Sequence, residues 1–293
     1  MMRLVRSELL KVWTTKAWWL IGLAALVITG LVLAGTMFDA YYSFHPQPYE
    51  PPPGMPPEQQ AAMEVERQHA AARAGTRALV VSVATSLVTA GSCLGVMLVM
   101  LMGILIVTNE FHHQTATTTF LTTPRRTGVI SAKLITALLI AVAFWLVTTV
   151  VNLIAGAVFL SIQGKELLFG EWSVIRAILL NLAAYSCWAV LGIGLAVLIR
   201  SQIGTVVTGV LVYLASVPAA FIAFGAIRQF LIKDDWVLTA QVAVPSIASM
   251  VMTSTDRLYP EAPPQWVGAL VLVGYGLVAG VIGTLITRRR DIS

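Results

Sequence analysis

Charged residues are scarce in this chain. Only 11% of its 293 residues are Asp, Glu, Lys or Arg, whereas 57% are hydrophobic. A soluble domain carries roughly 25% charged residues, so the composition excludes an ordinary soluble protein. Six stretches contain no charged residue or histidine, and each exceeds the roughly 20 residues that a helix needs to cross a bilayer. The sequence therefore predicts an all-α polytopic membrane protein rather than a barrel of alternating strands.

The six apolar stretches also lack ionisable groups in their interior. A proton- or sodium-coupled transporter usually needs such a group inside the membrane, so the pattern disfavours an ion-coupled secondary transporter. Sodium held by backbone oxygens keeps that alternative open. Neither the charged ring nor the filter-like loop of an ion channel is evident. The interior polar groups are neutral, and Thr89, Asn152 and Asn181 are candidates for a substrate pathway.

Motifs for catalysis and for metal binding are missing as well. Gly164–Glu166 (GKE) has neither the glycine spacing nor the Ser/Thr of a phosphate loop. The two cysteines, Cys93 and Cys187, have no CxxC partner. His112 and His113 are adjacent, so on a helix they point about 100° apart, which disfavours a shared metal ion. We expect a chain that is not an enzyme, holds no metal or cofactor, binds no nucleic acid, and must draw energy for uphill transport from another chain.

The whole chain, 1–293, is predicted to form one transmembrane domain. The six expected spans cover about 17–38, 84–108, 134–160, 177–199, 203–227 and 265–287. Eleven of the 19 basic residues lie in the short segments 1–16, 109–133, 200–202 and 288–293, against eight in the longer segments 39–77, 161–176 and 228–264. Since Lys and Arg concentrate on the cytoplasmic side, both termini are predicted there. Membrane-surface anchors would be Arg125, Arg126, Arg288, Arg289 and Arg290.

The N-terminal segment, 1–16, is predicted to be an amphipathic helix lying in the membrane interface. Its apolar residues recur every three or four positions, opposite a polar stripe, with Trp13 at headgroup depth. The apolar positions are Met2, Val5, Leu9 and Val12, and the polar stripe is Arg3, Ser7 and Lys11. A fraying N-terminus without special geometry is the alternative.

Two outside segments have patterns of their own. The loop 39–77 begins with a proline-rich run that favours extended backbone, followed by residues of good helix propensity that predict a helix leading into the second span. In 228–264, an apolar run interrupted by Pro245 is too short to span comfortably, so a re-entrant or interfacial element is expected. Within the spans, GxxxG pairs at Gly91/Gly95 and Gly276/Gly280 predict close helix contacts.

The polar segment between the second and third spans, NEFHHQTATTTFLTTPRR (109–126), interrupts two apolar runs. Pro124 ends or restarts a helix, and Thr123 would cap the next helix with Pro124 at its first position. A short cytoplasmic helix over about 109–123 is therefore predicted, with Arg125, Arg126 and Lys133 at headgroup level. Threonines are mediocre helix formers, so such a helix would need a partner to dock against. An ordinary interfacial loop is the alternative.

Two stretches resemble the membrane subunit of type-2 ABC exporters, bacterial permeases that work with a separate ATPase. SELLKVWTTKAWWL (Ser7–Leu20) is similar to the opening elbow helix of that family. NEFHHQTATTTFLTTPRRTGVISAKL (Asn109–Leu134) is similar to its acidic-aromatic, Thr-rich segment. His112 and Gln114 depart from the usual basic residue and glycine. The six-span layout extends the resemblance over the whole chain.

The resemblance implies a permease in the bacterial inner membrane, formed by two copies of this chain or by this chain and a homologue. Two ATPase subunits would bind ATP and Mg and dock on the coupling helix, 109–123. The elbow helix would use Glu8, Lys11 and Trp13. The implied ATPase contacts are Glu110, Phe111, His112, His113, Thr115, Thr118 and Thr119. Glu110 would offer charge to a basic ATPase residue, so Glu110→Lys would uncouple hydrolysis from transport and leave insertion intact. A non-transporting membrane assembly protein is the remaining alternative.

Overall fold

The computed structural model describes residues 1–46, 55–112, 126–199, 201–254 and 259–289, and this part of the chain contains helices and no strands. The helices of the first half are α1 (Met2–Thr14), α2 (Ala17–Phe44), α3 (Pro57–Arg73), α4 (Arg77–Val88), α5 (Ser92–His112) and α7 (Arg126–Ile162). Those of the second half are α8 (Trp172–Leu198), α9 (Gln202–Phe230), α10 (Trp236–Thr239), a 3₁₀ turn η1 (Ala240–Ala243), α11 (Pro245–Thr253) and α12 (Gln265–Arg289).

Six of the helical segments are long and apolar enough to cross a membrane, as the sequence predicts. They are Ala17–Phe44, Arg77–Glu110, Gly128–Ile162, Trp172–Leu198, Gln202–Phe230 and Gln265–Ile282. Several run beyond the charge-free stretches; α2 continues to Phe44 and ends just before Pro46. The chain is thus a multi-pass membrane protein.

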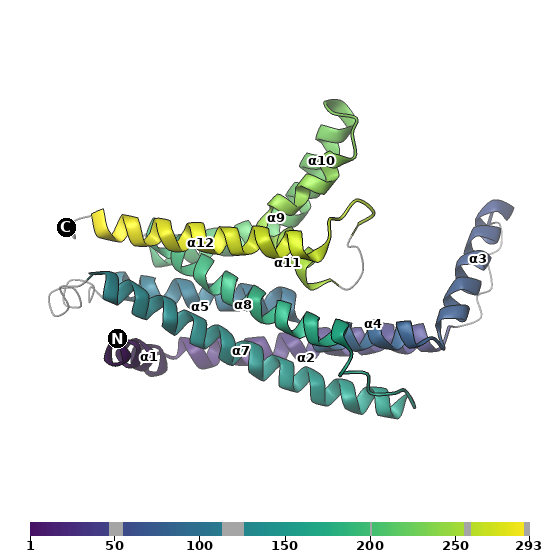
Figure 1. Cartoon of the computed structure of the whole chain (residues 1–293), viewed down its shortest axis with the longest axis horizontal. Helices are drawn as coiled ribbons and strands as arrows, with labels where there is room; N and C mark the ends of the chain where they lie inside the picture. Colours follow the sequence, from purple (N-terminus) through teal and green to yellow (C-terminus); the bar gives the residue numbers. More distant parts are fainter. Residues whose placement is uncertain (47–54, 113–125, 200, 255–258, 290–293) are drawn as a thin grey trace.

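The long helices lie side by side, with both chain termini at one end of the bundle (Figure 1). The last turn of α5 and the first turn of α7 lie at that same end. At the opposite end α3 stands away from the bundle (Figure 1). α9 and α10 project obliquely from the side of the bundle. Six candidate spans agree with α1 and the end of α12 lying at one end of the bundle.

The tightest packing in the bundle joins α5 to α8. A Cβ added to Gly103 would lie 2.4 Å from the carbonyl oxygen of Ala189, and one added to Gly192 would lie 2.2 Å from that of Met100. The two backbones are therefore in direct contact. On the other side of α8, a Cβ added to Gly194 would lie 2.7 Å from Ala279 Cβ on α12. α5 and α8 supply most of the buried residues of the main hydrophobic core, to which α12 contributes Leu272.

The two GxxxG pairs selected from sequence differ in how closely they approach their neighbours. Gly95 lies directly against the Tyr185 hydroxyl, and Gly91 adopts a φ of +74°. At Gly276 and Gly280 an added Cβ would meet its nearest neighbours only at 3.9 Å, an ordinary contact distance. The pair on α12 therefore does not mark a close helix crossing.

The segment before the last span is helical but sharply bent. Trp236–Ala243 and Pro245–Thr253 meet at 100°, an arrangement typical of a broken span or a re-entrant loop. Pro245 stands in the first turn of α11, where its missing N–H costs no hydrogen bond. The backbone around the bend is held by Tyr275, which donates a hydrogen bond to the Ala243 carbonyl at 3.0 Å.

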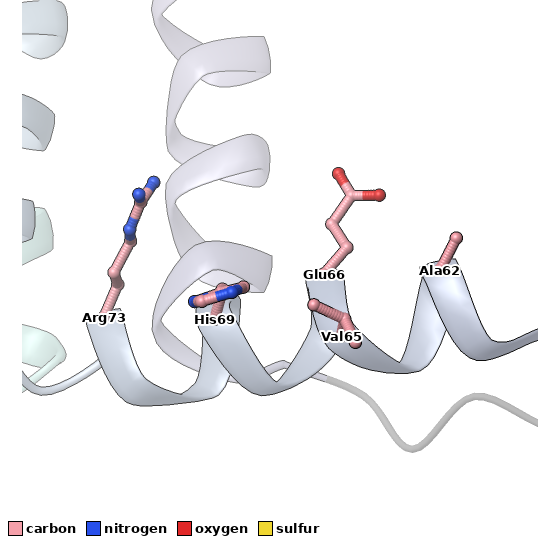
Figure 2. A pocket seen from close by; sticks show the side chains of 5 residues that line it. All are labelled: Ala62, Val65, Glu66, His69 and Arg73. Carbon is pink, nitrogen blue, oxygen red and sulfur yellow. The ribbon is translucent and has the colours of Figure 1, made fainter.

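The helix predicted in the first outside loop is present as α3, and α4 follows it with Thr76 as N-cap. Figure 2 shows a pocket on α3 lined by Ala62, Val65, Glu66, His69 and Arg73. All five residues come from one helix, so this hollow is an open surface feature that does not enclose a ligand.

Candidate functional site

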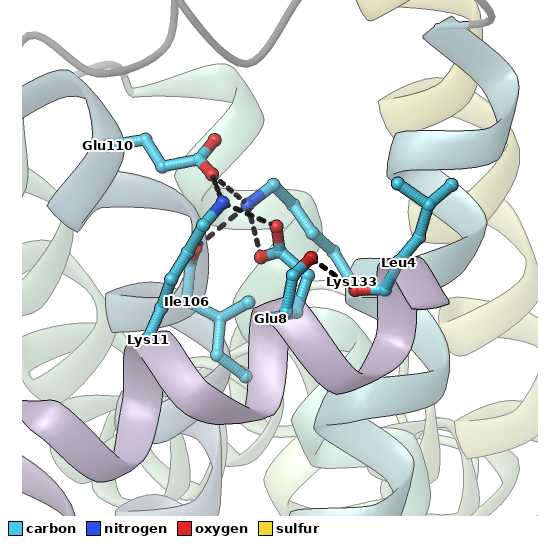
Figure 3. A network of polar contacts seen from close by, with 7 residues as sticks. Leu4, Glu8, Lys11, Ile106, Glu110 and Lys133 are labelled. Atoms are coloured by element: carbon cyan, nitrogen blue, oxygen red, sulfur yellow. Dashed lines mark hydrogen bonds and ion pairs between the residues drawn. The ribbon is translucent and has the colours of Figure 1, made fainter. Parts of the chain in front are cut away.

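Four charged side chains from three helices meet at the end of the bundle that holds the termini (Figure 3). Glu8 and Lys11 come from α1, three residues apart and so on one helix face. Glu110 lies near the end of α5, and Lys133 lies in the second turn of α7. We call Glu8, Lys11, Glu110 and Lys133 the ion-pair network.

Each lysine of the ion-pair network bridges both carboxylates. The Lys11 ammonium lies 2.6 Å from Glu8 Oε1 and 2.6 Å from Glu110 Oε1. The Lys133 ammonium lies 2.8 Å from Glu8 Oε2 and 2.8 Å from Glu110 Oε1. Lys133 also donates to the Ile106 carbonyl at 3.3 Å, one turn before Glu110 on α5. The network therefore ties α1, α5 and α7 together through charge-assisted hydrogen bonds.

Complete pairing matters in this network because a buried charge without a partner is costly. Its two carboxylates and two ammoniums cancel in charge. Glu8, Glu110 and Lys133 are 4%, 6% and 6% exposed. Lys11 is the half-exposed member. Burial opposes the charge of its ammonium, but hydrogen bonds to Glu110 and Glu8 outweigh that cost and hold the pKa of Lys11 above its usual value of 10.5. Its charge is therefore kept at neutral pH.

A neutral hydrogen bond ties the same end of α5 to a fourth helix. Gln202, the first residue of α9, donates from Nε2 to Asn109 Oδ1 at 3.0 Å. Asn109 and Glu110 are neighbours, so two consecutive residues of α5 connect it to α9 on one side and to α1 and α7 on the other. The end of α5 is thus a junction of four helices.

The structure brings together three of the residues selected from sequence, Glu8, Lys11 and Glu110. It buries the Glu110 carboxylate against Lys11 and Lys133 of its own chain. The negative charge of Glu110 is therefore already paired within the chain. Lys133, expected at headgroup level, has its ammonium buried in the network, and its depth in a membrane stays a prediction. Trp13 on α1 is 62% exposed, which is compatible with headgroup depth. Its ring packs against that of Trp18, with 4.6 Å between the ring centroids and a tilt of 40° between the rings.

The predicted cytoplasmic helix is only partly within the described residues. Positions 109–112 continue α5, and α7 begins at Arg126. The side chains of Phe111, His112 and Arg126, and those of Arg288 and Arg289 at the end of α12, are outside the description. Also outside it are His113, Thr115, Thr118, Thr119, Arg125 and Arg290.

The three candidates for a substrate pathway fall in different surroundings. Thr89 lies in the short break between α4 and α5 and donates back to the Thr85 carbonyl at 2.9 Å. Asn152 on α7 is buried and donates to two carbonyls beside that break. Asn181 on α8 is buried, and its amide oxygen has no partner. Asn152 is therefore engaged within the chain, which disfavours it as a substrate contact.

Metal chemistry finds no support among the described residues, where no group of three His, Cys, Asp or Glu side chains could hold an ion. The chemistry available at the ion-pair network is electrostatic, since its groups already neutralise one another. Its contacts hold α1, α5 and α7 together.

Comparison with known proteins gives no assignment. No protein family matches the chain, and no curated protein matches it either.

Proposed function

We propose that this chain is the membrane-spanning permease subunit of an ATP-driven ABC exporter, working with a separate ATPase and lying in the bacterial inner membrane with both termini in the cytoplasm. A second copy or a homologue completes the pathway. The observation that carries the proposal is the ion-pair network, which links the N-terminal helix to the two helices that flank the 109–123 segment. A motor that pushed on that segment would move α1, α5 and α7 together.

Three further observations support this function. Six helices are suited to cross a membrane. The bent pair before the last span has the form of a broken span or a re-entrant loop, and the second of these is the element expected in the segment 228–264. Gln202 extends the junction to α9, so force on the α5 end reaches four helices.

In the proposed cycle, ATP closes the two ATPase subunits and shifts the 109–123 segment on each permease. The shift reaches α1 through Lys11 and Glu8, and reaches α7 through Lys133. The role of Glu110 is then internal, as the residue that anchors α5 to the other helices. Contact with the ATPase falls to the residues after it, from Phe111 to Thr119.

The test is a mild-detergent pull-down of the tagged chain from its native membrane, with mass spectrometry of the recovered proteins. A stoichiometric ATPase is expected, and it should be lost in Thr118→Arg/Thr119→Arg. The matched control is Glu171→Gln, which removes an exposed ion pair with Arg77 at the other end of the bundle. Recovery of the chain without any ATPase, even after cross-linking, would contradict the proposal.

An ion-coupled secondary transporter is the second candidate. Buried polar oxygens without partners, among them those of Thr149, Asn152 and Asn181, favour it because neutral oxygens can coordinate sodium. Transport that depends on a sodium gradient and persists without ATP would select this alternative. Transport that stops when ATP is removed would select the exporter.

A further inference from the structure

The second span is interrupted within the membrane. α4 ends at Val88 and α5 begins at Ser92, although the 34 residues Arg77–Glu110 together qualify as one span. Between them Gly91 has a φ of +74°, a conformation that other residues rarely adopt. A Cβ there would also lie 2.8 Å from Thr29 Cα on α2. Glycine is thus required twice, by the backbone conformation and by the packing.

Breaking a helix in hydrocarbon exposes backbone groups that no water can satisfy. In an unbroken helix the N–H of Ser92 would bond to the Val88 carbonyl, four residues earlier. Here it donates to the Thr89 carbonyl instead, at 3.1 Å. The Val88 carbonyl therefore needs another donor, and the Ala90 carbonyl lies in the break itself.

A single side chain supplies both donors. The Asn152 amide nitrogen donates to the Val88 carbonyl at 3.2 Å and to the Ala90 carbonyl at 2.9 Å. An amide NH₂ has two hydrogens, so its donor capacity matches the two carbonyls. Asn152 is 2% exposed and belongs to α7, not to the broken span. The clamp therefore joins the break to a neighbouring helix.

We infer that Asn152 is the positioning residue of a hinge in the second span, which lets α4 and α5 tilt separately during the transport cycle. The inference rests on the proposed function. At one end α5 is fixed to α1, α7 and α9 by the network and Gln202. A push on that end of α5 bends the span at a point between there and α4. The break is the place where the regular hydrogen bonds of the helix are already replaced. The side-chain bonds of Asn152 can follow the carbonyls as the angle changes.

The hinge is tested with pairs of spin labels on either side of the break. Ala78→Cys and the native, exposed Cys93 are fifteen residues apart, or about 22 Å along a helix. The matched pair is Leu139→Cys with Ile154→Cys, equally spaced and exposed on the continuous helix α7, in a chain carrying Cys93→Ala. All variants also carry Cys187→Ala.

The first measurement uses the purified chain in lipid nanodiscs and needs no ATPase. With Asn152 present, the pair across the break should give one narrow distance distribution. Asn152→Leu should broaden it severalfold, and Asn152→Gln, which keeps two donors, should restore much of it. The α7 pair should stay unchanged throughout. An unchanged distribution across the break in Asn152→Leu would overturn the clamp.

The second measurement compares native membrane vesicles with and without ATP and vanadate. The distance across the break should shift by several ångströms, while the α7 pair stays fixed. A clamp shown in nanodiscs but no shift in vesicles would overturn the hinge and make Asn152 a static cap. The pull-down reports independently on the ATPase, so failure of the hinge and failure of the proposed function remain distinguishable.

Discussion

The ion-pair network and the clamped break solve the same problem in opposite ways. Both satisfy polar groups away from water and both join α7 to the second span. The network uses four charges from three helices, whereas the break uses one neutral amide and two carbonyls. Charged groups lose a large hydration energy on burial and must be paired completely. A neutral amide tolerates longer and shifting hydrogen bonds. The comparison suggests a rigid junction at one end of the span and an adjustable joint inside it.

The largest effect is expected from removing one carboxylate of the network. Glu8→Gln leaves the buried Lys133 ammonium and the half-exposed Lys11 ammonium facing a single carboxylate. The free energy of unfolding should fall by about 3–5 kcal/mol, as it does when one partner of a buried pair is lost. Unfolding by SDS in mixed micelles measures this change. Glu64→Gln, on the exposed helix α3, is the control and should have little effect.

A double variant sharpens this prediction. Glu8→Gln with Lys133→Gln restores a neutral network, so its loss of stability should be smaller than the sum of the two single losses. Simple additivity would mean that the two groups do not share one network. Charge reversal by Glu110→Lys would bring three ammoniums together, so it tests folding more than it tests coupling.

The two lysines of the network should differ in importance. Lys133 is buried and makes three polar contacts, whereas the Lys11 side chain is 43% exposed and can be hydrated. Lys133→Gln should therefore cost about 2 kcal/mol more than Lys11→Gln, because exposed ion pairs contribute little. The same SDS titration compares the pair. Equal losses of unfolding free energy in the two variants would contradict the prediction that the buried Lys133 matters more for stability than the half-exposed Lys11.

At the break, Asn152→Leu should be milder than the loss of a network charge. It leaves two carbonyls without donors, at a cost of about 1–3 kcal/mol. Asn181→Leu is the matched control on α8; it removes an amide oxygen that has no partner, so it should be neutral or slightly stabilising. If Asn181→Leu destabilises the protein as much as Asn152→Leu, the special role of the break is contradicted.

The smallest effect is expected at the opposite end of the bundle. Arg77 pairs with Glu171 there, and the Arg77 side chain is 69% exposed. Glu171→Gln should change the free energy of unfolding by less than about 1 kcal/mol. The free energy of unfolding of Glu171→Gln should depend on salt concentration about as much as that of the parent chain. A loss comparable to that of Glu8→Gln would remove the contrast between exposed and buried pairs.

The spans could be predicted from sequence because hydrophobic length is a local property. Charge-free runs identified all six, and propensity identified α3 and the interruption at Pro245. The ends of α2 and α7 were less predictable, because a helix can continue beyond its apolar stretch. It ends where a residue such as Pro46 cannot continue the helix.

The partners of the candidate residues could not be predicted in the same way. Glu8, Lys11 and Glu110 were selected, but for contact with the interface or with another protein. Lys133 was assigned to the headgroups because basic residues at span ends usually lie there. Glu8 and Lys133 are separated by 125 positions, and only the packing of α1 against α7 reveals their pairing. The ATPase contacts stay predictions.

Glycine contacts show the same limit. The motif selected Gly276 and Gly280 from one helix, whereas the closest backbone contacts involve Gly103 and Gly192 on two different helices. A single glycine on each of two chain segments forms no sequence motif. Its significance depends on the register between the helices, which local spacing does not specify.

That contact between α5 and α8 has a mechanical consequence. Where two backbones touch without intervening side chains, there are no rotamers to rearrange and little room for one helix to slide along the other. α12 also packs on α8, where a Cβ added to Gly194 would lie 2.7 Å from Ala279 Cβ. Displacement of α5 would therefore carry α8 with it and, through that contact, α12. A small displacement of the α5 end at Glu110 would then tilt three spans together, with α5 receiving the force and α8 and α12 moving with it.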